Sequence, residues 1–175
     1  MALTGLALAL SACAAGVPTP TVSQPPTVAP TPALDVASLD PCSLFDAGEL
    51  STLLSASLRG ERADDLDGYH VCRYDDPAAS TSLSVLVATE PFPAGRGEDM
   101  VDQLPQDGLA EELHGVGEAA WFDYCPACPD VGSTTLTVIE PPLELTLALT
   151  LPATDMMRRI PLEELARDVI ANLGL

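Results

Sequence analysis

Two cysteines with a spacing typical of reactive thiol pairs give this sequence its clearest chemical motif, Cys125-Pro126-Ala127-Cys128. Such a pair becomes reactive when its first cysteine begins a helix, because the helix dipole stabilises the thiolate. Here residues 129–133 read as a turn that leads into a strand, and nearby Asp123 would disfavour a thiolate. We therefore predict that Cys125 and Cys128 form a structural disulfide bracing a loop between strands. Thiol–disulfide exchange is the alternative.

The chain has 5 cysteines, and if Cys13 is modified the remaining four permit three disulfide pairings in an oxidising compartment. We expect Cys42 to pair with Cys72, because Cys42 begins a predicted helix and Cys72 lies within a predicted strand. The second bridge is then Cys125–Cys128. Zinc would need two further ligands, for which the chain offers only 2 histidines, so we predict no metal and no cofactor.

The other titratable groups give weaker signals. Residues 64–68 resemble part of a calcium loop but lack its closing glutamate, so a solvated acidic loop is the simpler interpretation. The pairs Asp75-Asp76 and Glu111-Glu112 are expected to be exposed charges that keep the domain soluble. His114 could be a catalytic base, but no partner for it is visible. We predict no catalytic residue and a non-enzymatic protein.

The N-terminus resembles an export signal. An apolar stretch too short to span a membrane leads into Leu10-Ser11-Ala12-Cys13, which is similar to the bacterial lipobox. In that resemblance residues 1–12 are a lipoprotein signal peptide, and the thiol of Cys13 receives a diacylglycerol. The segment contains no Lys or Arg, which a start codon further upstream would explain. We expect a protein anchored by lipid to the extracytoplasmic face of the cell membrane.

A stalk and an acidic domain are predicted beyond this cysteine. Residues 13–34 are rich in Pro and Thr and contain no charged side chain, which favours an extended spacer. The whole chain has 7 Lys+Arg and 26 Asp+Glu, a net charge of −19, which excludes nucleic-acid binding. A hydrophobic fraction of 47% nevertheless predicts a folded core.

Periodicity predicts a single α+β domain over residues 35–175. Apolar residues at helical spacing indicate helices over residues 46–58 and 161–173, and a short helix over residues 98–104 with Met100, Val101 and Leu104 inward. Alternating residues predict about five strands, over residues 69–74, 80–90, 119–124, 134–140 and 143–151. Tight connections favour an antiparallel sheet. We expect the N-terminal and C-terminal helices to pack on one face of this sheet.

The order of several weak motifs resembles a known family. The motifs are Asp40-Pro41-Cys42 before a helix, Val71-Cys72-Arg73-Tyr74 in a strand, and Gly115-Val116-Gly117-Glu118-Ala119-Ala120-Trp121 entering another. In this order they resemble a family of small actinobacterial lipoproteins catalogued as a domain of unknown function. The resemblance implies an envelope lipoprotein with an α+β domain, and it supplies no catalytic residues.

The predicted architecture favours binding over catalysis. Two helices can cover one face of the sheet, so the other face would be partly solvated. We expect that face, or the loops at residues 64–68 and 125–130, to bind another envelope component, either protein or glycan. The alternatives are a thiol–disulfide protein using Cys125 and Cys128, and a small lipid or ligand carrier.

Overall fold

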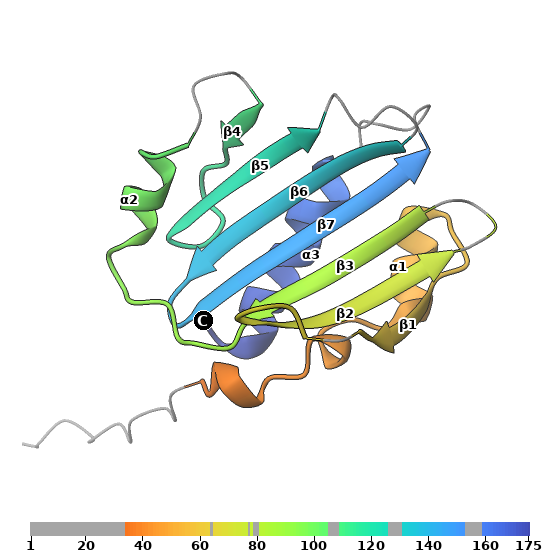
Figure 1. Ribbon diagram of the computed structural model, residues 1–175, viewed down its shortest axis with the longest axis horizontal. Helices are drawn as coiled ribbons and strands as arrows, with labels where there is room; N and C mark the ends of the chain where they lie inside the picture. Colours follow the sequence, from red (N-terminus) through yellow and green to blue (C-terminus); the bar gives the residue numbers. More distant parts are fainter. Residues whose placement is uncertain are drawn as a thin grey trace, which may run out of the picture. The chain divides into compact units, whose positions relative to one another are not determined.

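One antiparallel sheet dominates the computed structural model, which describes residues 34–63, 65–76, 78, 81–104, 109–125, 131–152 and 159–175 (Figure 1). Its strands follow the order β1-β2-β3-β7-β6-β5-β4. Their bounds are β1 (Arg59–Arg62), β2 (Tyr69–Asp76), β3 (Thr81–Ala88), β4 (Ala110–Glu112), β5 (Ala119–Cys125), β6 (Val131–Glu140) and β7 (Leu143–Pro152). The α+β class is therefore confirmed.

The strand count differs from the expectation of about five. All five predicted strands are present, as β2, β3, β5, β6 and β7. The two that were missed, β1 and β4, form the edges of the seven-stranded sheet. Both are short and polar, with four and three residues, so neither shows the apolar alternation that marks a strand in a sequence. Gly60, two residues beyond the predicted helix at 46–58, lies within β1.

The N-terminal helix is shorter than expected. Helix α1 (Ala47–Leu54) begins as predicted at Asp46, whose side chain accepts hydrogen bonds from the backbone N–H groups of Gly48 and Glu49 at 2.8 and 3.0 Å. It ends because Ser55 adopts a left-handed conformation, φ 52°. Leu58 is buried, but it follows the helix instead of belonging to it.

Two short 3₁₀ turns precede α1, η1 (Val36–Ser38) and η2 (Pro41–Ser43). The predicted Asp40-Pro41 start is real, because the Asp40 carboxylate accepts from the Cys42 N–H at 3.0 Å, but it initiates a 3₁₀ turn and not an α-helix.

The C-terminal helix α3 (Arg159–Leu173) packs against β6 and β7. It buries Leu162, Leu165 and Val169 at helical spacing, with Ala166 buried beside them. On its exposed side Arg167 forms an ion pair with Glu163 four residues earlier, with 2.7 Å between Nη2 and Oε1. The helix thus supplies an apolar surface to the sheet and an acidic, polar surface to solvent.

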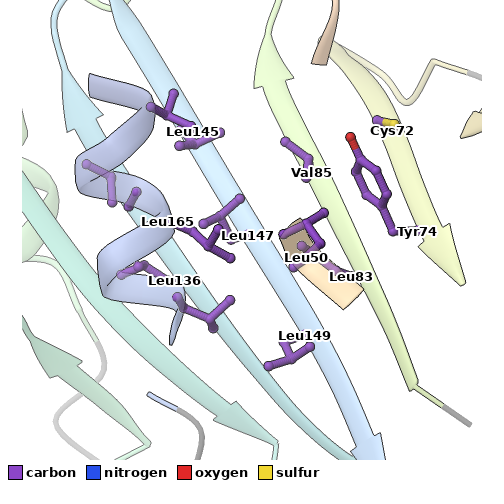
Figure 2. Packing of buried hydrophobic residues seen from close by; sticks show 14 of the residues in the cluster. Leu50, Cys72, Tyr74, Leu83, Val85, Leu136, Leu145, Leu147, Leu149 and Leu165 are labelled. Carbon is purple, nitrogen blue, oxygen red and sulfur yellow. The ribbon is translucent and has the colours of Figure 1, made fainter. Parts of the chain in front are cut away.

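The main core lies between these helices and one face of the sheet. Leu145, Leu147 and Leu149 of β7 are at most 1% exposed and belong to the same apolar cluster as Leu50 of α1 and Leu165 of α3 (Figure 2). Figure 1 shows α1 and α3 behind the sheet. Burying one such side chain contributes roughly 1.5–3 kcal/mol. This face is therefore committed to holding the fold together.

A smaller apolar cluster lies on the opposite face, at the β5 side. Ala119, Trp121 and Ile139 pack there with Phe92, Val101 and Leu104, which bring helix α2 (Gly97–Val101) against the sheet. The expectation that Met100 points inward is wrong, since it is 40% exposed. Trp121 is a buried member of this cluster, 7% exposed.

Candidate functional site

The side of the sheet facing away from α1 and α3 carries a regular array of small side chains. In the strand register, Ser82 pairs with Thr150, and Thr150 pairs with Ser133. The next row on the same face consists of Ser84, Ala148 and Thr135. We call this array the open face. It consists of Ser82, Ser84 and Leu86 on β3, Thr146, Ala148 and Thr150 on β7, and Ser133, Thr135 and Thr137 on β6.

The open face is uncharged and rich in hydroxyl groups. Apart from the buried Thr137, its members are half-buried. The hydroxyls of Thr137 and Thr146 lie 3.3 Å apart and share a hydrogen bond across the strands. Strand pairing satisfies the backbone polar groups beneath, so a partner can contact this surface without breaking the sheet. The open face is therefore a platform of uncharged, mostly small side chains.

Charged and aromatic residues border this platform. On the β2 side Arg73 and Asp75 form a loose ion pair, 4.0 Å between Nε and Oδ2. On the β5 side the indole N–H of Trp121 donates to the Asp123 carboxylate at 3.1 Å. Together with the α2 cluster, these groups confine the uncharged area to the middle strands, β3, β7 and β6.

A pocket of about 350 Å³ continues the open face at the end where β2 and β7 begin and β3 finishes. The Tyr69 hydroxyl donates a 2.7 Å hydrogen bond to the Glu144 carboxylate across it. This bond, with burial and the carboxylate charge, raises the pKa of Tyr69 to about 12, so the phenol stays protonated at neutral pH. The lining residues are Gly68, Tyr69, Ala88, Thr89, Glu90, Pro91, Phe92, Pro93 and Glu144.

The sequence did not reveal the pair of Tyr69 and Glu144. Alternation with the leucines of its strand indicates that Glu144 faces solvent, but the sequence assigns no side to Tyr69. Their contact depends on β3 lying between β2 and β7, and strand order across a long connection leaves no trace in local periodicity.

A second pocket, about 190 Å³, lies on the helical side, where Leu44, Phe45, Asp46, Glu49 and Leu50 meet Leu165, Asp168 and Asn172 of α3. It is formed where α1 and α3 pack, and it is separate from the open face.

One carboxylate holds α2 in place. Glu118 accepts hydrogen bonds from the backbone N–H groups of Gly95 and Gly97, at 3.0 and 2.8 Å. These backbone donors lower the pKa of the Glu118 carboxyl, because they stabilise its charged form. The motif Gly115-Val116-Gly117-Glu118 thus fixes the border of the open face.

The predicted disulfide between Cys42 and Cys72 is present, with Cα atoms 5.1 Å apart. It joins η2 to β2, so it connects the N-terminal segment to the sheet as expected. Tyr74, two residues along β2, adds its hydroxyl, which lies 3.2 Å from the carbonyl oxygens of Cys42 and Phe45 and donates to them.

The other cysteine predictions are not tested. Cys125 ends β5, where the backbone but not the side chain is described, and Cys128 lies outside the described residues. The Cys125–Cys128 bridge therefore stays a prediction. Cys13 and the lipobox also lie outside the described residues, as does most of the 125–130 loop.

Both histidines lie near carboxylates. His70 contacts Asp65 at 3.2 Å and the Ala37 carbonyl at 3.0 Å, while His114 is exposed and lies 3.1 Å from Glu112. In the part of the chain that the structure describes, no three His, Cys, Asp or Glu residues are grouped to hold a metal ion.

The expectation of an exposed Asp75-Asp76 pair is wrong for Asp76. This residue is only 7% exposed, and its carboxylate accepts from the backbone N–H groups of Ser57 and Ala78 at 2.7 and 2.9 Å. A buried carboxylate with two such donors organises the chain after α1. Glu111 and Glu112, by contrast, are exposed on β4 as predicted.

Comparisons with known proteins do not classify the chain. No family model matches it, and no curated protein or solved structure is significantly similar to it. The resemblance to actinobacterial lipoproteins therefore stays a prediction. None of the described helices combines the length and the apolar character needed to cross a bilayer.

Proposed function

We propose that this protein is a lipid-anchored envelope lipoprotein whose folded domain binds another envelope component, protein or glycan, without catalysis. The observation that carries the proposal is the open face, an uncharged array of hydroxyl and methyl groups in the middle of a protein of net charge −19. A partner would make its closest contact with the uncharged open face, and charged residues such as Arg73, Asp75 and Asp123 lie at its border.

The physical cost of covering this surface is small. Short Ser, Thr and Ala side chains lose little conformational freedom when a partner contacts them, and their hydroxyls can donate or accept a hydrogen bond. The underlying sheet is already ordered, so binding requires little rearrangement. These properties suit a recognition surface better than a site that must move protons.

A lipid carrier is less well supported. Among the described residues, the hollows of about 350 and 190 Å³ are open to the surface, whereas a carrier encloses whole acyl chains. Disulfide exchange through Cys125 and Cys128 remains the alternative from the sequence.

The test of the binding surface is site-specific photo-crosslinking in the protein's own host. A photoreactive phenylalanine at Ala148, in the centre of the open face, should give a discrete adduct that the further substitution Ser84→Arg abolishes. The same probe at Glu164, on the exposed side of α3, is the control and should give no such adduct. Adducts of equal strength from Glu164, or none from Ala148, would contradict the proposal.

The anchor is tested separately. We expect the full-length chain to partition into detergent with a diacylglycerol on Cys13, and Cys13→Ala to appear in the soluble fraction after a salt wash. A Cys13→Ala protein that stays with the membrane would refute lipid anchoring at this residue and leave the open face untouched.

A further inference from the structure

The Tyr69–Glu144 pocket lies directly beside the open face, and its chemistry narrows the choice of partner. On β7, Glu144 precedes Thr146 by two residues, and on β3, Ala88 follows Leu86 by two. Both therefore share the side of the sheet that carries the open face. A partner that covers the open face would reach the pocket at its end.

The polar side chains of the pocket favour a cation. Glu144 and Glu90 both belong to its lining, and none of the described residues that line it is Lys, Arg or His. The Tyr69 hydroxyl donates to Oε1 of Glu144, which orients the carboxylate and leaves its remaining lone pairs as acceptors. An ionised carboxylate fixed in this way binds an ammonium or guanidinium group better than a neutral hydroxyl.

The walls fit the stem of a long basic side chain. Tyr69, Phe92, Pro91 and Pro93 supply aromatic and apolar surface around the two carboxylates. Lysine and arginine bury their methylene stems on such surface while the charged end reaches polar groups, and an aromatic face also attracts the cation. A volume of about 350 Å³ is sufficient for one such side chain.

The pocket is held in shape before any ligand binds. The backbone N–H of Thr89 donates to the Gly68 carbonyl at 2.9 Å, and the Thr89 hydroxyl donates to the same oxygen at 3.2 Å. The N–H of Phe92 donates to the Pro142 carbonyl at 2.9 Å, which attaches the Pro91–Pro93 wall to the β6–β7 turn. Preorganisation of this kind lowers the entropic cost of binding.

We propose that this pocket receives a lysine or arginine side chain of a protein partner that covers the open face. The inference rests on the proposed function and selects protein over glycan. The chain's net charge of −19 supports it, because a basic partner is attracted at long range and then positioned by the pocket.

The experiment uses NMR of the full chain at about 0.15 M salt, where Debye screening beyond about 8 Å suppresses diffuse charge effects. The probes are Nα-acetyl-lysine methylamide, its arginine counterpart and the neutral norleucine analogue. We expect the two cationic probes, and not norleucine, to shift the amide signals of Tyr69, Thr89, Phe92 and Glu144. Glu144→Gln should weaken lysine binding about tenfold, the loss expected for one charge-assisted hydrogen bond.

The matched control is Glu140→Gln, which removes the same charge from the same hairpin outside the pocket and should change affinity less than twofold. Tyr69→Phe keeps the ring and should weaken binding about twofold by releasing the carboxylate. Equal losses in both Gln variants, no shifts with the cationic probes, or a chitin trisaccharide shifting the same amides would each overturn the proposal. Loss of the open-face crosslinks would instead refute the proposed function, so the two failures are distinguishable.

Discussion

The phenol of Tyr69 and the carboxylate of Glu144 depend on each other, and this dependence can be measured. The raised pKa of Tyr69, about 12, comes first from its hydrogen bond to Glu144. We predict that Glu144→Gln moves this pKa down toward the ordinary value of 10, because the substitution removes the negative charge. Titration of the tyrosine ¹³Cζ signals by NMR would show the change.

The linked effect on stability has a defined sign. The folded state holds the phenolic proton more tightly than the unfolded chain does, so the contribution is complete below pH 10 and is lost as the pH rises toward about 12. Glu140→Gln should leave the Tyr69 titration unchanged. A Tyr69 pKa that is the same in Glu144→Gln as in the original chain would show that the Glu144 carboxylate does not cause the raised value.

Two glycines in one motif share a backbone conformation but differ in the space around them. Gly115 and Gly117 both have positive φ, 78° and 63°. A Cβ on Gly115 would meet nothing within 4 Å, whereas one on Gly117 would approach the Ile139 carbonyl oxygen to 2.5 Å. We predict that Gly115→Ala costs about 1 kcal/mol of unfolding free energy and Gly117→Ala about 2–4 kcal/mol.

Urea unfolding of the two variants gives these values directly. The difference between them reports the close approach to β6, since the conformational penalty is common to both. Equal losses would mean that the loop relaxes away from Ile139 at no cost.

At the scale of elements, helix α2 is too short to be stable alone. A helix of five residues makes too few hydrogen bonds to offset the unfavourable free energy of nucleation. Its position therefore depends on Glu118 and the small apolar cluster. We predict that Glu118→Gln increases hydrogen exchange at the amides of Gly95 and Gly97, because a neutral amide is a weaker acceptor than a carboxylate. Exchange measured by NMR on both proteins tests this.

The pH dependence of this contact follows from the lowered pKa of Glu118. The contribution is present above the ordinary carboxyl pKa of 4.5 and is lost as the pH falls through the lower folded value. Protection of Gly95 should therefore decrease on acidification in the original chain and stay low throughout in Glu118→Gln. Protection that does not respond to pH would assign the docking of α2 to its apolar contacts alone.

The elements that the sequence predicted are those that bury one face. The alternation from Leu143 to Leu151 and the stripe ending at Leu173 both reflect burial on a single side, and both elements are present. The polar edge strands β1 and β4 bury little, so hydrophobic periodicity could not reveal them. The buried Asp76 was missed for a related reason, since its partner Ser57 lies 19 residues away.

At the scale of the whole molecule, the Cys42–Cys72 bridge closes a loop across a sequence separation of 30 residues. We predict that replacing both cysteines by Ala lowers the free energy of unfolding by about 3–4 kcal/mol, the loop-closure contribution for this length. Urea unfolding with and without a reductant tests this. The reductant should cause no further loss of stability through this loop in the double-Ala variant, which has no bond there to reduce. A urea midpoint that is the same in the variant as in the original, oxidised chain would contradict the prediction.

The existence of a solvated sheet face could be predicted from the sequence, but the composition of the open face could not. The polar residues of β3 and β7 alternate with apolar ones, which indicates that they face away from the helices, whereas the sequence of β6 assigns no such side. Their assembly into one uncharged array requires the register that pairs Ser84 with Ala148 and Ala148 with Thr135. The first of these pairs joins residues 64 positions apart, and no local pattern encodes that pairing.

The same pairing determines when the sheet can form. Strands β1 to β3 are consecutive neighbours, as are β4 to β7, and the two groups meet only where β3 pairs with β7. As the chain is synthesised, the free edge of β3 must therefore wait for the last strand. Until residues 143–152 emerge, the early hairpins lack their central neighbour, and contacts so distant in sequence are slow to form. Completion of the sheet is thus postponed until β7 has been made.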